Sequence, residues 1–307
     1  MLRQFIHDNQ NADVAQLALQ RNRYPMLSDS DFRFALQQIE GRQRTRDKLP
    51  TFAAIDGWLY PPRLNLEQCS SERTARFKAS LLSSLNPQPS TLNLIDATGG
   101  YGVDTFFMSE QAAQTHYFEQ NADLAAIAEH NFRLAGKTIH CHPAPFTLQS
   151  LSTFDFRLST IIYLDPARRD SHGGKVFRLE DCTPNVIDII RQIRAIRTEP
   201  QIRVLLKLSP MLDFHQAVRQ LGGAWDVYAV SVNGEMKELL LLSEGSGKVN
   251  AVMLSDDSEQ VFTFTPDEES RAEVQYLPAE VSLAGMFVYE PDAALLKAGA
   301  FRLISAC

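Results

Sequence analysis

Apolar residues recur at helical spacing over about the first ninety residues of the chain. Prolines interrupt this pattern at Pro25, Pro50, Pro61 and Pro62, so we expect several short helices. Ser30 and Asp31 precede one apolar stripe, which is typical of a capped helix start.

A second capped helix is predicted after Ser70 and Ser71. Its apolar stripe includes Ala75, Phe77, Leu81 and Leu82, and we expect its exposed side to carry Arg73, Arg76 and Lys78. These cations are interpreted either as a solvated helix face or as part of a basic surface.

From about residue 91, short apolar runs alternate with segments of helix length. This alternation predicts βαβ units and a mostly parallel sheet, and therefore an α/β fold. The predicted strands are 92–97, 115–119, 138–142, 160–165 and 204–208, and the predicted helices are 103–112, 122–135, 185–197 and 212–221.

Two further strands, 226–232 and 237–243, are separated by only four residues. Four residues are too few for a parallel crossover, so these strands predict a hairpin and an antiparallel last strand. Beyond residue 246 come acidic stretches, a strand at 261–264 and a final helix at 293–306. We therefore predict a helical region at 1–90, an α/β domain at 91–246 and a small α+β unit at 247–307. Because the chain ends in helical sequence, we expect it to be part of a longer protein.

The composition is that of a globular protein. Of 307 residues, 44% are hydrophobic and 22% are charged, which argues against disorder. No apolar run approaches the roughly 18 residues that a membrane span requires, and the first twenty residues lack the apolar core of a signal peptide. Four cysteines without close pairing favour a reduced, cytoplasmic protein.

The net charge of −7 is distributed unevenly. The net charges are +3 for residues 1–90, −5 for 91–156, +4 for 157–207 and −9 for 208–307. The two basic segments either form one positive surface that faces a polyanion or lie apart in the fold.

A glycine-rich turn follows the first predicted strand, in the segment from Asp96 to Asp104. Its spacing does not match the G-x-G-x-x-G dinucleotide motif. Asp96 ends the first strand, and Glu119 ends the second strand 23 residues later. A carboxylate in the position of Glu119 accepts both hydroxyls of a ribose, which suits a nucleoside-containing cofactor. The alternatives are a tight strand–helix connection for the glycines and a helix-cap or surface acid for Glu119.

These features together resemble class I S-adenosylmethionine-dependent methyltransferases, which have a Rossmann-like sheet. The run from Asp96 to Thr105 is similar to a motif of ribosomal RNA guanine-N2 methyltransferases, and the helix at 68–75 is similar to one in trimethylguanosine synthase. The segments 165–169 and 289–292 resemble a bacterial methyltransferase family with a ferredoxin-like unit and a THUMP-like domain. The resemblance covers roughly residues 60–307, and we expect this chain to lack the C-terminal THUMP-like domain.

The resemblance implies a set of cofactor-binding residues. Those expected around the amino acid end of S-adenosylmethionine are Ser70, Asp96, Thr98, Gly100, Gly102 and Asp104. Glu119 would hold the ribose, while Gln120 or Asn121 and, by stacking, Phe146 would contact the adenine. The segment His140-Cys141-His142 lacks the acid that many relatives use there, and alternating strand positions argue against a metal site.

The resemblance also implies a site for the methyl acceptor. Asp165 and Pro166 occupy the position of the Asp-Pro-Pro-aromatic motif of amino methyltransferases, so Asp165 would accept a hydrogen bond from the target amine and also lie beside the cofactor. Arg168 replaces the aromatic residue and would stack on a base or pair with a phosphate. Candidate substrate-binding cations are Arg169, Lys175 and Arg178. The alternative is that Arg168 and Arg169 form salt bridges with neighbouring acids.

Cys182 is interpreted as an inert thiol, because pyrimidine carbon-5 methyltransferases place their nucleophile near the fifth strand. The function that the resemblance implies is methyl transfer from S-adenosylmethionine to RNA, with a base amino group as one acceptor. Alternatives are a protein or small-molecule acceptor, and an RNA-binding or assembly protein with weak catalytic activity. We expect no membrane association.

Overall fold

The computed structural model describes residues 1–154, 158–167, 179, 182–196, 202–276, 280, 282 and 284–305. The chain divides into two compact units, Met1–Thr153 and Phe154–Cys307, and each is described by itself. In the part of the chain described, no helix is long and apolar enough to cross a membrane.

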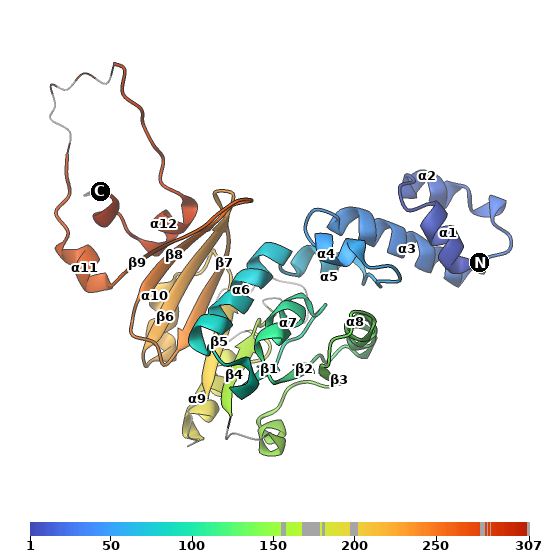
Figure 1. Cartoon of the computed structure of the whole chain (residues 1–307), viewed down its shortest axis with the longest axis horizontal. Helices are drawn as coiled ribbons and strands as arrows, with labels where there is room; N and C mark the ends of the chain where they lie inside the picture. Colours follow the sequence, from blue (N-terminus) through green and yellow to red (C-terminus); the bar gives the residue numbers. More distant parts are fainter. Residues whose placement is uncertain are drawn as a thin grey trace. The chain divides into compact units, whose positions relative to one another are not determined.

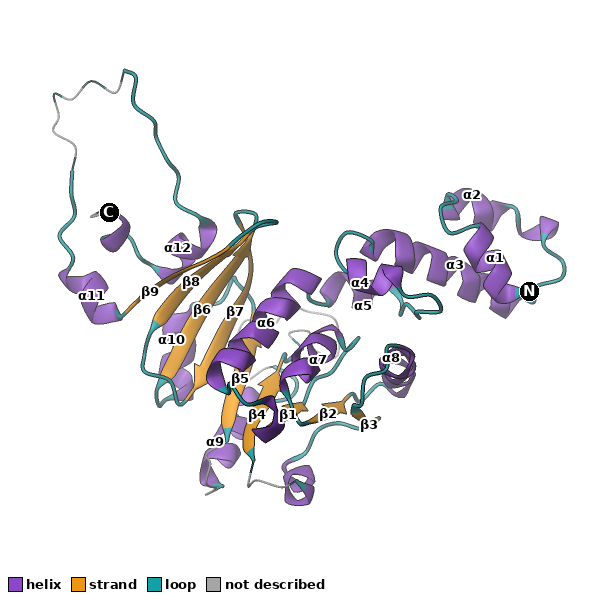
Figure 2. Cartoon of the chain, in the orientation of Figure 1, coloured by secondary structure: helices purple, strands orange, loops and turns teal. Residues whose placement is uncertain are grey.

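The first unit begins with a series of helices (Figure 2). These are α1 (Leu2–Asp8), α2 (Val14–Leu19), α3 (Asp29–Thr45), α4 (Pro50–Ala54), α5 (Arg63–Gln68) and α6 (Glu72–Leu85), with short 3-10 turns at Arg21–Arg23 and Pro89–Thr91. The Ser71 hydroxyl accepts a hydrogen bond from the Thr74 amide, which confirms the predicted cap of α6. Helix α3 begins slightly earlier than predicted, because Ser28 is its cap.

Buried residues of α1, α2, α3 and the segment between α2 and α3 form a small core. Its members are Phe5, Leu17, Leu27, Phe32, Ala35 and Ile39. The rings of Phe5 and Phe32 lie 5.7 Å apart, and Arg21 lies over the Phe32 ring at 5.2 Å. The N-terminal helices are therefore held together by apolar packing of their own.

Three parallel strands follow in the first unit, in the order β3-β2-β1. Their bounds are β1 (Leu92–Asp96), β2 (Gln114–Phe118) and β3 (His140–His142), with α7 (Val103–Met108) after β1 and α8 (Ala122–Leu134) after β2. Short 3-10 segments lie at Ser109–Gln111 and Leu148–Thr153. Every residue of β1 is buried, including the polar Asn93 and Asp96, as in a strand covered on both faces.

The strands of the second unit run in the order β4-β5-β7-β6-β8-β9 (Figure 1). The strands are β4 (Ser159–Leu164), β5 (Arg203–Leu208), β6 (Trp225–Val232), β7 (Glu235–Ser243), β8 (Val249–Leu254) and β9 (Glu259–Phe264). The helices are α9 (Val186–Ala195), α10 (Phe214–Leu221), α11 (Pro266–Arg271) and α12 (Ala293–Ala298), with a 3-10 turn at Leu303–Ser305. β4 and β5 are parallel, whereas β7 is antiparallel to both β5 and β6. The predicted α/β fold with an antiparallel last strand is thus confirmed.

The predicted hairpin turns through Asn233 and Gly234, which have φ values of 50° and 78°. A two-residue turn with positive φ at both positions matches the twist of the flanking strands, and Asn-Gly is the sequence that favours it. The connection was predicted to have four residues. In the structure it has only Asn233 and Gly234, because β7 begins at Glu235.

Two features beyond residue 246 differ from expectation. The segment Val249–Leu254 forms β8, which pairs in parallel with β6, so the predicted unit at 247–307 contributes strands to the same sheet as β4–β7. The predicted helix at 293–306 is wrong in its second half, because α12 ends at Ala298 and Gly299 caps it. Gly299 has a φ of +79°, which is the left-handed conformation that ends helices. α12 lies against β6, β7 and β8.

Candidate functional site

The glycine turn after β1 is anchored by Asp96, which is 1% exposed. One carboxylate oxygen of Asp96 accepts a hydrogen bond from the Thr98 amide at 3.0 Å, and the other accepts one from the Thr105 hydroxyl. Asp96 thereby ties the start of the turn to α7. Asp96 lies at the end of β1, where the resemblance places it. The hydrogen bonds that its carboxylate accepts fix the conformation of the turn.

The three glycines of the turn have different roles. A Cβ on Gly99 would lie 2.1 Å from the Tyr117 ring, and one on Gly102 would lie 2.5 Å from the Phe132 ring. These two positions need glycine because the protein itself packs against them. A Cβ on Gly100 would meet only the Thr98 carbonyl oxygen, at 3.9 Å. Gly100 has a φ of +55° and is thus the glycine whose backbone a ligand can approach.

Glu119 lies directly against this open position. Its Oε2 accepts a hydrogen bond from the Gly100 amide at 2.9 Å, and its Oε1 accepts one from the Asn121 amide at 2.7 Å. The Asn121 side chain in turn caps α8. The sequence-predicted pair Gly100 and Glu119 is therefore brought together within the first unit.

This arrangement fits the nucleoside-containing cofactor that the sequence implied. Each carboxylate oxygen of Glu119 has two lone pairs, so it can accept ribose hydroxyls in addition to backbone amides. The open side of Gly100 leaves room for a group to lie against the backbone. Gly102 belongs to the same turn, and Thr98 is held by Asp96.

Ser70 and Asp104, two further predicted cofactor ligands, lie in a buried network with Lys78. The Ser70 hydroxyl donates to Asp104 Oδ2 at 2.8 Å, and Lys78 Nζ lies 3.2 Å from Asp104 Oδ1. The Lys78 side chain is 0% exposed, so the prediction that it lies on the exposed side of its helix is wrong. It occupies the same stripe as Ala75 and Leu82 and pairs with a carboxylate, which explains how a lysine tolerates this position.

A hydrogen-bonded ring cluster connects the N-terminal helices to the glycine turn. The Trp58 indole N–H donates to the Tyr101 hydroxyl at 2.7 Å, and that hydroxyl donates to the Leu59 carbonyl at 3.0 Å. Burial raises the pKa of Tyr101 well above its ordinary value, so the phenol stays protonated. The sequence did not single out these residues.

The two residues predicted at the adenine edge differ in their surroundings. Gln120 is exposed, whereas Phe146 is 8% exposed. The Phe146 ring meets Phe118 edge to face at 5.4 Å, and Phe118 stacks on His142 at 4.3 Å. Their roles in cofactor binding stay predictions.

His116 packs among histidines on one face of β2 and β3. Its Nδ1 lies 3.2 Å from His142 Nε2, and its ring stacks on His140 at 4.8 Å. Burial, then the neighbouring His140 and His142, lowers the pKa of His116 to about 4. Burial likewise lowers the pKa of His142.

The low pKa of His116 predicts acid lability. Between about pH 6.5 and 4 the unfolded chain binds a proton at His116 that the folded chain does not, so stability falls as pH falls through this window. Because His116 is only partly buried, solvent screening reduces the loss below the roughly 3 kcal/mol that the full shift would give. Urea unfolding of wild type and His116→Asn across this range measures it, with exposed His7→Asn as the control. An equal pH slope for all three proteins would contradict the prediction.

In the second unit, Asp165 directly follows β4 and contacts a lysine of the neighbouring strand. Lys207 Nζ lies 2.7 Å from Asp165 Oδ2. Pro166 is buried, and Ala167 exchanges backbone hydrogen bonds with Thr183 at 2.9 and 3.0 Å. The Asp-Pro segment is therefore held on both sides of Pro166. Lys207 is not among the site residues predicted from the sequence.

Four predicted site residues, Arg168, Arg169, Lys175 and Arg178, lie outside the described residues. Arg76, a cation of α6, pairs with Glu72 at 2.7 Å and lies over the Phe107 ring at 4.6 Å. Cys182 is buried, as expected for an inert thiol. Over the described ranges, no group of three or more His, Cys, Asp or Glu is arranged to hold a metal ion.

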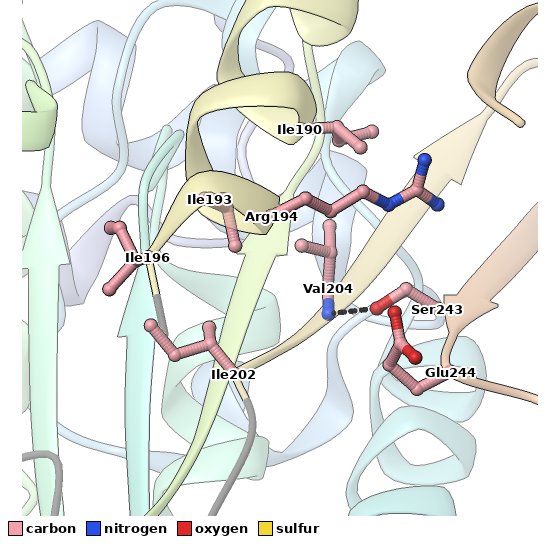
Figure 3. A pocket seen from close by; sticks show the side chains of 8 residues that line it. All are labelled: Ile190, Ile193, Arg194, Ile196, Ile202, Val204, Ser243 and Glu244. Carbon is pink, nitrogen blue, oxygen red and sulfur yellow. Dashed lines mark hydrogen bonds between the residues drawn. The ribbon is translucent and has the colours of Figure 1, made fainter. Parts of the chain in front are cut away.

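Two hollows are found among the described residues of the second unit. Figure 3 shows the smaller, which Ile190, Ile193, Val204 and Ser243 help to line, with a volume of about 10 Å³. That volume holds no more than about one water molecule. The larger hollow, of about 360 Å³, has His215, Phe264, Glu269 and Arg302 among its lining residues. Neither hollow is lined by a predicted site residue.

Comparison with known proteins identifies the type of fold. No protein-family model matches the chain, and no curated protein matches it. Among solved structures it is similar to a putative methyltransferase from Porphyromonas gingivalis W83, with 27% sequence identity and a TM-score of 0.79 over 99% of this chain and 73% of that chain.

Two other solved structures are more distant. A type I restriction-modification methyltransferase subunit from Streptococcus thermophilus has 15% identity and a TM-score of 0.42, over 71% of this chain and 50% of that chain. A tRNA m1G37 methyltransferase from M. jannaschii has 14% identity and a TM-score of 0.34, over 57% and 50%. These two carry no argument about this chain. The first comparison, with the strand order, shows the Rossmann-like fold of methyltransferases.

Proposed function

We propose that this protein transfers a methyl group from S-adenosylmethionine to RNA. The observation that carries the proposal is the open backbone at Gly100 with the Glu119 carboxylate hydrogen-bonded to it. The fold shared with the Porphyromonas protein supports the same class of reaction. S-adenosylmethionine supplies a methyl group that its sulfonium already activates, so the protein's task is binding and orientation.

The residues divide this task between them. Glu119 accepts hydrogen bonds from ribose hydroxyls, and Gly100 allows close approach to the backbone. Asp165 accepts a hydrogen bond from the N–H group that becomes methylated, which orients the nitrogen lone pair toward the methyl group. In each of these roles the protein positions a reacting group. Positioning is the main contribution that a protein makes to methyl transfer.

An RNA acceptor is supported by charge and by the resemblance to RNA-modifying families. Residues 157–207, which include Asp165, carry a net charge of +4 in a chain whose total is −7. A segment with an excess of cations attracts phosphates. The proposal has two finer parts. The chain belongs to the family with a THUMP-like domain, and the acceptor is a base amino group.

Cofactor binding is the first test. Titration calorimetry of S-adenosylmethionine and S-adenosylhomocysteine against wild type should give a measurable dissociation constant. Glu119→Ala should weaken binding about 10- to 100-fold, since it removes charge-assisted hydrogen bonds of roughly 1.5–3 kcal/mol in total. Asp123→Ala, which removes an exposed acid four residues later, is the matched control and should bind like wild type. No binding by wild type, or equal binding by Glu119→Ala, would exclude the cofactor assignment.

Methyl transfer is the second test. Wild type is incubated with S-adenosylmethionine labelled at the methyl group and with total RNA from cells that lack the protein. We expect wild type to incorporate the methyl label into RNA, and we expect this incorporation to depend on Glu119. Cofactor binding without incorporation into RNA would favour a protein or small-molecule acceptor, or a binding protein with weak catalytic activity.

A further inference from the structure

The end of β2 holds the glycine turn through three consecutive residues. The Phe118 carbonyl accepts a hydrogen bond from the Gly99 amide at 2.8 Å, and Glu119 Oε2 accepts one from the Gly100 amide at 2.9 Å. The Tyr117 hydroxyl donates to the Gly100 carbonyl. Gly100 is therefore bound to the end of β2 both at its N–H group and at its C=O group.

These contacts fix the two backbone dihedral angles of Gly100. The N–H group of a residue belongs to the peptide plane before its Cα atom, and the C=O group belongs to the plane after it. Glu119 holds the first plane and Tyr117 holds the second. Rotations about φ and ψ relate these two planes to each other. Gly100, a residue type that otherwise populates many conformations, is therefore held at its φ of +55°.

The Tyr117 ring is itself held by packing, so its hydroxyl has a defined position. The residue is 0% exposed. Its ring lies against Gly99, where an added Cβ would approach within 2.1 Å, and meets the Phe132 ring of α8 edge to face at 5.5 Å. Burial, and then the charges of Glu119 and Asp96, raises the pKa of Tyr117 well above its ordinary value, so the phenol keeps the proton that it donates.

A glycine held in this way reduces the cost of binding a ligand. A flexible glycine has to be ordered when a ligand comes to lie against its backbone, and the apparent affinity falls with the fraction of molecules in the competent conformation. Gly100 is ordered by Glu119 and Tyr117, while the space beside its Cα atom stays open. The turn is thus arranged to receive a ligand without first being reorganised.

We propose that Tyr117 is a positioning residue for S-adenosylmethionine. Through its hydrogen bond to the Gly100 carbonyl, it keeps the glycine turn in the conformation that receives the cofactor. Tyr117 is fully buried, so it acts through Gly100 and not by contact with the cofactor. The inference rests on the proposed function and adds a residue to the machinery of that site.

The test compares Tyr117→Phe with wild type, because this change removes the hydroxyl and keeps the ring. In titration calorimetry, the dissociation constants of S-adenosylmethionine and S-adenosylhomocysteine should rise about 5- to 10-fold, the change that the loss of one ordinary hydrogen bond produces. For methyl transfer to total RNA from cells that lack the protein, KM for the cofactor should rise similarly. We expect kcat to stay within about twofold, because bound cofactor orders the turn at saturation.

The matched control is Tyr60→Phe. It removes the hydroxyl of another buried tyrosine of the first unit, which donates to the Phe52 carbonyl. Tyr60→Phe should bind both ligands like wild type, even where its melting temperature falls.

A second measurement does not depend on the stability of a variant. In cofactor-free wild type, the backbone order parameter of Gly100 from NMR relaxation should be about 0.85, the value of rigid backbone. It should fall in Tyr117→Phe. A value below about 0.6 in cofactor-free wild type would show that the turn is not held in advance, and would overturn the inference.

The outcomes separate the inference from the proposed function. Wild type that binds neither S-adenosylmethionine nor S-adenosylhomocysteine overturns both. Wild type that binds them no more tightly than folded Tyr117→Phe overturns the inference alone. Equal weakening by Tyr60→Phe also overturns it, because the effect would then follow from lost stability. If wild type binds the cofactor but methylates no RNA, the proposed function is wrong, while weaker binding by Tyr117→Phe alone still supports the inference.

Discussion

Lys78→Met should lower the free energy of unfolding by about 3–5 kcal/mol, the cost of removing one partner from a buried ion pair. The Lys78 side chain is 0% exposed and that of Asp104 is 9% exposed, with 3.2 Å between their charged atoms. Without the ammonium group, a carboxylate stays in a poorly solvated site. Ser70 still donates to it, but a hydroxyl does not neutralise its charge. Urea unfolding monitored by circular dichroism measures the loss.

A second variant separates charge from packing. Asp104→Asn removes the negative charge and keeps an oxygen that accepts from Ser70. The combination of Lys78→Met with Asp104→Asn should therefore be more stable than Lys78→Met alone, because no uncompensated charge remains. A double variant whose loss equals the sum of the two single losses would show that Lys78 contributes by packing. Arg73→Met, on the same helix and only partly buried, is the control and should cost less than about 1 kcal/mol.

The regular elements could be predicted from the sequence because their signals are local. The run Leu92–Asp96 is rich in apolar residues and the structure buries all of it, and Asn233-Gly234 is a turn signal of two residues. The strand Val249–Leu254 was missed because Asn250 interrupts its apolar run beside an acidic stretch. In the structure the Asn250 amide donates to the Val227 carbonyl, so a tertiary contact makes the polar residue acceptable in a buried strand.

The candidate site could be predicted only in part, for a related reason. Asp96, Gly100 and Glu119 end strands or form turns, and the order of elements brings such positions together. Lys78 and Lys207 each pair with a carboxylate that is distant in sequence, and no periodicity specifies such a pair. The stripe shared with Ala75 and Leu82 was the available signal for the burial of Lys78, since residues three and four apart lie on one helix face.

Asp165→Ala should reduce methyl transfer by about 10²-fold or more while leaving cofactor affinity within several fold. The expectation follows from its place after β4 and from its proposed role toward the methyl acceptor. Glu119 and the Gly100 turn are assigned to the cofactor instead. Asp165→Asn should retain more activity, because the amide oxygen still accepts a hydrogen bond both from an acceptor N–H and from Lys207.

The contact with Lys207 requires that rate and stability be measured together. Asp165→Ala removes the carboxylate that a mostly buried ammonium group contacts, so its melting temperature should also fall. Adding Lys207→Met to Asp165→Ala removes that ammonium group and should recover melting temperature without recovering transfer. Single-turnover transfer, calorimetry with S-adenosylmethionine and thermal unfolding on the three variants distinguish the two effects. If folded Asp165→Ala transfers methyl groups at the wild-type rate, Asp165 does not orient the acceptor, and its contact with Lys207 serves the fold alone.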